Sequence, residues 1–117
     1  MRLARVVNVT TGETLAARAE VAESFFDRFM GLQGRPDLPV GAGLILAPTS
    51  SIHMFFMRFP IDAVFVDSAS HVTKVGRRLR PWSVGPFSSG ALMCVELPAG
   101  VAERTLPGHT VELRPVE

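Results

Sequence analysis

The most apolar part of this 117-residue sequence is Ile52-His53-Met54-Phe55-Phe56-Met57-Arg58-Phe59-Pro60-Ile61-Asp62-Ala63-Val64-Phe65-Val66. Proline lacks an amide hydrogen and keeps the preceding residue out of the helical conformation, so Pro60 excludes one continuous helix. We therefore expect two β-strands here, over Ile52–Phe59 and Ile61–Asp67. Together with a third strand over Val72–Leu79, they form a predicted meander at the centre of the chain.

The rest of the chain alternates short apolar segments with turn residues, a pattern typical of all-β domains. Leu3–Val9 and Thr14–Val21 flank a Thr-Thr-Gly-Glu turn and so predict a hairpin. About seven short strands and little helix predict a single antiparallel β-sandwich or a partly closed barrel with one or two short helices. The remaining expected elements are strands over Leu44–Ala47, Ala91–Leu97 and Thr110–Arg114, a helical turn at Val101–Thr105 and a long loop over Pro81–Gly90.

One short helix is predicted over Phe25–Met30. Ser24 precedes it as a residue whose side chain can cap the first turn, and Gly31 follows as a residue that tolerates the left-handed conformation at a helix end. Because residues four apart share a helix face, we expect Phe25, Phe29 or both to pack on the sheet.

Length and composition place the sequence among globular domains. Its mass of 12.7 kDa fits one domain over residues 1–117, and 47% hydrophobic with 20% charged residues is too apolar for a disordered chain. The longest uncharged apolar stretch, Val40–Pro48, is far shorter than the ~18 residues that a membrane-spanning helix requires. Met1–Arg5 precedes a Val-Val-Asn-Val-Thr-Thr run and not the apolar core of a signal peptide, so we expect a cytoplasmic protein with no membrane partner.

The sequence offers few metal ligands. A single cysteine, Cys94, excludes an internal disulfide and a four-thiolate zinc site. In a strand, His53 and Met57 would share a face but lie about 13 Å apart at ~3.3 Å per residue, too far for one ion to bridge. Methionine on an apolar strand usually fills a core. We therefore expect no metal and no cofactor, although soft ligand types are present at His53, Met54, Met57, Met93 and Cys94.

The charges are balanced overall and uneven along the chain. Twelve basic and 11 acidic residues give a net charge of +1, which argues against a general nucleic-acid-binding protein. No acidic residue lies between Asp67 and Glu96. This segment is either a solvated strand edge, which its charges protect from pairing, or an anion-binding rim beside Trp82 and Phe87. Its basic residues are Lys74, Arg77, Arg78 and Arg80.

Two carboxylates, Asp62 and Glu96, are the candidate catalytic residues. Alternation along a strand places each of them on an apolar face, where burial raises a carboxyl pKa. A pair on neighbouring strands could supply the acid and the base of a hydrolase. Alternatively each carboxylate is held by backbone amides or by an arginine, and for Glu96 we expect a buried ion pair with an arginine. The candidate arginines are Arg28, Arg35 and Arg58.

Three segments together resemble a known family. They are Arg28–Arg35, Ile52–Asp62 and Val95–Gly100, and they are similar to the motifs of the domain-of-unknown-function family one-ninety-two. Gln33 stands where that family usually has methionine, and the turn after Asp67 lacks the usual glycine. The resemblance implies a small β-rich sandwich or barrel and implies no activity. The shared pattern falls on Arg28, Gly31, Leu32, Arg35, Phe56, Met57, Arg58, Pro60, Asp62, Glu96, Pro98 and Gly100.

The leading functional hypothesis is a small domain that binds a small anionic ligand or a peptide in a groove. Phe55, Phe56, Met57 and Trp82 would form its walls, because apolar and aromatic side chains line most ligand sites. Two alternatives are a hydrolase-like enzyme that uses Asp62 and Glu96, and an oligomerisation module whose apolar strand Ile52–Phe59 pairs across an interface. In the leading hypothesis the residues that select anions are Arg58, Arg77, Arg78 and Arg80.

Overall fold

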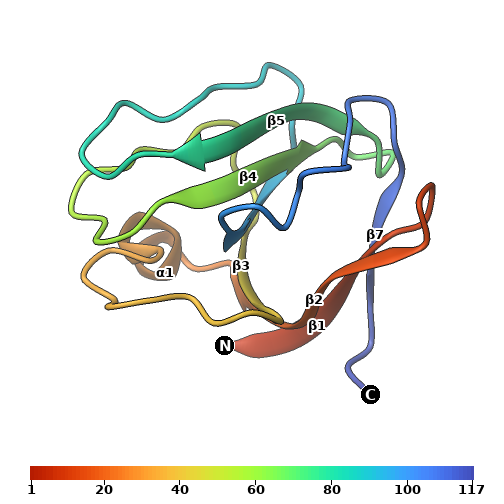
Figure 1. Ribbon diagram of the computed structural model, residues 1–117, viewed down its shortest axis with the longest axis horizontal. Coiled ribbons are helices and arrows are strands. Elements are labelled where there is room, and N and C mark those ends of the chain that lie inside the picture. The colour runs from red at the N-terminus through yellow and green to blue at the C-terminus, as the bar shows by residue number, and fades with distance from the viewer.

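Seven strands form one curled sheet, a half-barrel, in the computed structural model, which describes residues 1–117 (Figure 1). The strand order is β5-β4-β6-β3-β2-β1-β7, and every pair is antiparallel except β2 with β3. The mainly β prediction is confirmed in its partly closed form. The elements are β1 (Arg2–Asn8), β2 (Glu13–Ala22), α1 (Phe25–Met30), β3 (Ala42–Leu46), β4 (Ile61–Val66), β5 (Val72–Leu79), β6 (Met93–Pro98) and β7 (Val111–Arg114).

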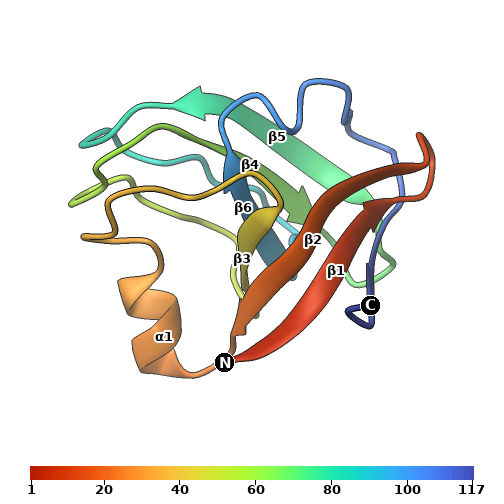
Figure 2. The same ribbon diagram turned by 60° about the horizontal axis from the view of Figure 1, so that its bottom comes forward.

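The parallel pair follows from the connection between β2 and β3. A parallel neighbour needs a crossover much longer than a hairpin turn. Here α1 and the loop after it form the crossover, and they bring the chain back so that Arg18 lies opposite Ala42 and Ala22 opposite Leu46. Figure 2 shows α1 at one side of the curled sheet, outside the layer of strands.

The two faces of the sheet bury separate hydrophobic clusters. The inner cluster joins the two ends of the curl, since it contains both Val72 of β5 and Val111 of β7. On the outer face, Leu44 and Ile61 pack under Met57 and other loop residues. The outer face is therefore covered by loops and not by a second sheet.

The predicted strand over Ile52–Phe59 is wrong. The chain turns at Phe55 and Phe56, and Phe56 has a φ of 65°. Met54 points into the outer cluster and is fully buried, whereas the two phenylalanines that follow it are exposed. The apolar run over Ile52–Phe59 is therefore a loop, whose buried side chains pack into the cluster on the outer face of the sheet. The oligomerisation hypothesis loses the strand on which it depended.

The other predicted strands are confirmed, with ends that differ by at most two residues. α1 has the predicted bounds, and the Ser24 hydroxyl accepts a hydrogen bond from the Asp27 amide at 3.0 Å. The expected packing of Phe25 and Phe29 on the sheet is wrong, because they are 77% and 59% exposed and no residue of α1 is buried. No helix of the structure has the length and hydropathy to cross a bilayer.

Asp62 connects three parts of the fold. It is fully buried, and its Oδ1 accepts a hydrogen bond from the Arg78 amide of β5 at 2.9 Å. Its Oδ2 accepts two more from the turn after β6, from Gly100 at 3.0 Å and Ala102 at 2.9 Å. Hydrogen bonds to a carboxylate are shorter and stronger than those between neutral groups. Asp62 therefore joins β4 to β5 and to the turn after β6.

Replacing Asp62 with Ala should lower the free energy of unfolding by about 3 kcal/mol or more, because buried amides lose a charged acceptor. Asp67→Ala is the matched control. The Asp67 carboxylate also accepts two amide hydrogen bonds, from Ala69 and His71, but in an exposed turn. Urea denaturation should show a loss of about 1 kcal/mol for the control. Equal losses in the two variants would contradict this role for Asp62.

Candidate functional site

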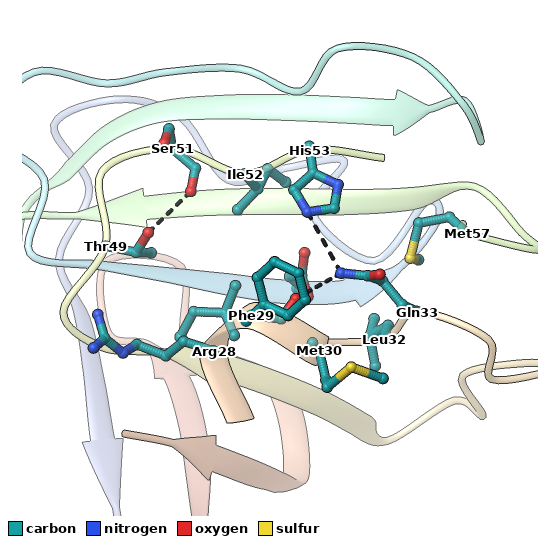
Figure 3. Close-up of a pocket in the computed structure, with 13 residues that line it drawn as sticks. Arg28, Phe29, Met30, Leu32, Gln33, Thr49, Ser51, Ile52, His53 and Met57 are labelled. Carbon is teal, nitrogen blue, oxygen red and sulfur yellow. Dashed lines mark hydrogen bonds between the residues drawn. The ribbon is translucent and has the colours of Figure 1, made fainter. Parts of the chain in front are cut away.

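A cavity of about 140 Å³ lies between α1, the loop of residues 49–57 and the outer face of β3 and β6 (Figure 3). Its lining is partly apolar and partly polar. The apolar lining consists of Phe29, Met30, Leu32, Leu46, Ile52 and Met57, and the polar side chains are those of Arg28, Gln33, Thr49, Ser51, His53 and Glu96.

The polar groups at the mouth gather at two ends. Figure 3 shows Arg28 and Thr49 at one end, Gln33 and His53 at the other, and the ring of Phe29 between them. Gln33 Nε2 donates a hydrogen bond to the Phe29 carbonyl at 2.6 Å and lies 3.4 Å from His53 Nε2. Both ends can therefore offer polar contacts to a ligand that lies along Phe29.

Glu96 lies deepest of the polar groups. It is 4% exposed, and neither of its carboxyl oxygens takes part in a hydrogen bond or a salt bridge within the protein; Oε1 is buried without any partner. The chain that ends α1 passes directly over this group, since a Cβ at Gly31 would lie 3.8 Å from Glu96 Oε1. Gly31 has a φ of 49°, which favours glycine at this close approach.

The predicted ion pair between Glu96 and an arginine is wrong. Arg35 instead pairs with Glu20, with 3.0 Å between Arg35 Nη2 and Glu20 Oε2. Arg28 Nη1 donates to the Pro48 carbonyl at 2.9 Å, and Arg58 is exposed and forms no ion pair. None of the three candidate arginines therefore forms an ion pair with Glu96.

Burial raises the pKa of Glu96 from 4.5 to about 7, and the charge of the nearby Arg35 opposes this shift only in part. Both protonation states of the carboxyl group are therefore populated at neutral pH. Cys94 lies two residues earlier on the same face of β6, where burial, with a smaller effect of Glu96, raises the pKa of its thiol well above the usual value. A protonated, enclosed thiol is a poor nucleophile.

Asp62 and Glu96 do not form a catalytic pair. The register of β4 and β6 places Asp62 opposite Leu97 and Glu96 opposite Ala63. Because side chains of neighbouring residues point to opposite faces of a sheet, the two carboxylates are separated by the sheet itself. The geometry therefore gives no support to a hydrolase mechanism in which the two carboxyl groups act together.

The structure also divides the predicted aromatic and arginine groove. Only Met57 lines the cavity, while Phe56 and Trp82 are exposed outside it with their ring centroids 4.9 Å apart. Arg77 donates to the Thr105 carbonyl, and Arg78 pairs with Glu103 at 2.9 Å. Arg58 and Arg80 are exposed and form no ion pair.

Reasoning from the residues missed most of the cavity, but one signal points to it. Residues from all three segments that carry the family resemblance line this cavity, although Arg28 and Glu96 are 68 positions apart in the sequence. The cavity residues that the sequence did not indicate as site residues are Phe29, Met30, Leu46, Thr49, Ser51 and Ile52.

The DUF192 family, described as Uncharacterized ACR, matches residues 6–113. The UPF0127 protein of Thermococcus sibiricus is 36% identical over 102 residues, which cover 84% of this chain. This chain spans 66% of the length of that relative, slightly less than two thirds. The UPF0127 protein of Pyrococcus furiosus is 32% identical over 84% of this chain and 86% of its own length. A crystal structure of a protein of unknown function from Novosphingobium aromaticivorans has a TM-score of 0.80 at 25% identity, covering 94% and 83% of the two chains.

The raised pKa of Glu96 predicts a pH-dependent stability. The folded state binds the proton more tightly than the unfolded state, so the extra stability is complete below pH 4.5 and is lost as the pH rises to about 7. At 1.36 kcal/mol per tenfold change in proton affinity, the loss is about 3 kcal/mol. Chemical denaturation across this pH range should show this loss in the free energy of unfolding of the wild type and not in that of Glu96→Gln. Parallel pH profiles would contradict it.

Proposed function

Since this chain belongs to the DUF192 family, as its three motifs predict, we propose that it is a ligand-binding domain whose site is the Glu96 cavity. The single observation that carries the proposal is the buried Glu96 Oε1 without a partner. Most buried polar atoms in folded proteins have a hydrogen-bond partner, and leaving one unsatisfied costs about 1 to 3 kcal/mol. A ligand that donates a hydrogen bond here would remove that cost.

The lining indicates three features of the ligand. Glu96 accepts a hydrogen bond, so the ligand carries a donor such as a hydroxyl group. Phe29, Ile52 and Met57 offer an apolar surface for its body. Arg28 has two hydrogen bonds, both to backbone carbonyls, so its charge has no acidic partner and favours an anionic group on the ligand.

This proposal keeps the expected small anionic ligand and moves its site from the aromatic and arginine groove to the cavity. The cavity's volume of about 140 Å³ favours a small molecule over a peptide. An anion is also compatible with Glu96, because burial raises its pKa to about 7 and the protonated form adds no negative charge.

Binding is better supported than catalysis. A nucleophile needs a base within hydrogen-bond reach, and the Thr49 hydroxyl instead donates to the Ser51 carbonyl at 2.9 Å. His53 Nδ1 accepts from the Phe55 amide at 3.2 Å. Thr49 and His53 are thus engaged with backbone groups, and neither the Thr49 nor the Ser51 hydroxyl forms a hydrogen bond with His53.

Mandelate carries all three ligand features, a hydroxyl donor, a phenyl body and a carboxylate, and it is the probe for this site. Phenylacetate lacks the hydroxyl group. Isothermal titration calorimetry should show that it binds with an affinity at least about tenfold lower than that of mandelate. Benzyl alcohol, which lacks the carboxylate, should lose a similar factor. Absence of mandelate binding at millimolar concentration would contradict the proposed ligand chemistry.

Two variants locate the binding. Glu96→Leu should bind mandelate and phenylacetate equally, and its stability should match or exceed that of the wild type, because it removes an unsatisfied buried polar group. Arg28→Gln should lower the affinity for both acids. Arg104→Gln, at an exposed arginine that is not part of the cavity lining, is the control and should bind as the wild type does. If Glu96→Leu still prefers mandelate over phenylacetate by the wild-type factor, the ligand binds outside the Glu96 cavity.

A further inference from the structure

Phe56 and Trp82 form an exposed aromatic pair outside the cavity, and Arg58 and Arg80 flank it in the sequence. We propose that these four side chains form a second binding site, separate from the Glu96 cavity, for a small anion that carries a planar aromatic ring, of the nucleoside monophosphate class.

The backbone holds both aromatic residues in a costly conformation. Phe56 has a φ of 65° and Trp82 a φ of 64°, in the left-handed region that bulky side chains rarely adopt. Glycine or asparagine would fit both positions with less strain. Strain of this kind persists where the surrounding structure enforces it and is concentrated at functional sites.

The strain is not offset by burial. Phe56 is 59% exposed and Trp82 is 62% exposed, although their ring centroids are only 4.9 Å apart with an angle of 58° between the ring planes. The pair therefore presents most of its aromatic surface to solvent. Such surfaces stack readily on the rings of ligands, and stacking on an aromatic side chain is tolerant of ring identity.

The two loops that carry the pair are fixed to each other. The Trp82 amide donates to the Met54 carbonyl at 2.7 Å, and the Met54 amide donates to the Ser83 carbonyl at 3.1 Å. Their close approach also requires glycine at position 85, since a Cβ at Gly85 would lie 2.1 Å from the Ile52 carbonyl oxygen. The aromatic pair is thus held in place before any ligand arrives, which lowers the entropic cost of binding.

Two arginines, each two positions in sequence from a member of the pair, favour an anion. Arg58 and Arg80 are exposed and free of ion pairs, unlike Arg78, which is neutralised by Glu103. No acidic residue lies between Asp67 and Glu96, the segment that contains Arg80 and Trp82. Arginine binds phosphate oxygens through two parallel hydrogen bonds. A ligand with one ring and one phosphate matches this combination, and the net charge of +1 argues against a long nucleic acid.

Trp82 is the only tryptophan of the chain, so its fluorescence reports on the site directly. Titration with adenosine monophosphate should quench the fluorescence and reach saturation. Adenosine, which lacks the phosphate, should bind at least about tenfold more weakly in the same titration. Ribose 5-phosphate, which lacks the ring, should be a similarly weak competitor.

Variants separate this site from general charge effects. The double variant Arg58→Gln with Arg80→Gln should lose about tenfold or more in affinity for adenosine monophosphate. Arg2→Gln with Arg114→Gln removes the same charge at exposed arginines of β1 and β7 and should bind normally. Phe56→Asn suits the positive φ, so it should fold with an unchanged melting temperature and bind about tenfold more weakly.

Four outcomes would overturn the proposal. They are quenching without saturation, equal binding of adenosine and adenosine monophosphate, equal losses in the two double variants, and a response of Trp82 to phosphatidylserine vesicles but not to the nucleotide. The Glu96→Leu variant makes the test independent of the cavity. It should bind adenosine monophosphate as the wild type does, whether or not mandelate binding is observed.

Discussion

Two buried carboxyl groups on opposite faces of one sheet determine how this molecule is built and where it can act. On the inner face, Asp62 accepts three backbone hydrogen bonds and so joins β4 to β5 and to the turn after β6. On the outer face, Glu96 has the same chemical group and no protein donor. The cost of burying the carboxyl group is offset by hydrogen bonds at Asp62 and is not offset at Glu96. We therefore propose a structural role for Asp62 and ligand binding for Glu96.

The outer face can hold a site because loops cover it. A second sheet or a long helix would fill the space with closely packed side chains. Here Met54 and Met57 fill part of the space, while α1 lies at its edge without a buried residue. The remaining volume is the Glu96 cavity, with Gly31 at close approach above the carboxyl group.

Local signals in the sequence predicted local structure well. The turn between β1 and β2, the Ser24 cap and Gly31 at the end of α1 each depend on residues within a few positions. The predicted strand over Ile52–Phe59 failed because the chain turns at Phe55 and Phe56, and because the hydrogen-bond partners of this segment lie in the loop that contains Trp82 and not in a strand. An apolar run does not reveal such a partner.

The candidate site was predicted only in part for a related reason. Alternation along β6 showed that Glu96 faces an apolar layer, and the structure confirms its burial. The sequence contains 11 arginines, and nothing in their spacing shows that Arg35 pairs with Glu20 instead. The opposite orientation of Asp62 follows from a register that only the assembled sheet defines.

The ionisation of Glu96 itself tests the central claim most directly. Carbon-13 NMR of the side-chain carboxyl group, assigned by comparison with Glu96→Gln, measures its titration in the folded protein. A desolvated carboxyl group without a protein donor should titrate with a pKa of about 7. A midpoint at the ordinary value of 4.5 would show that the group is solvated or already paired, and would contradict the account.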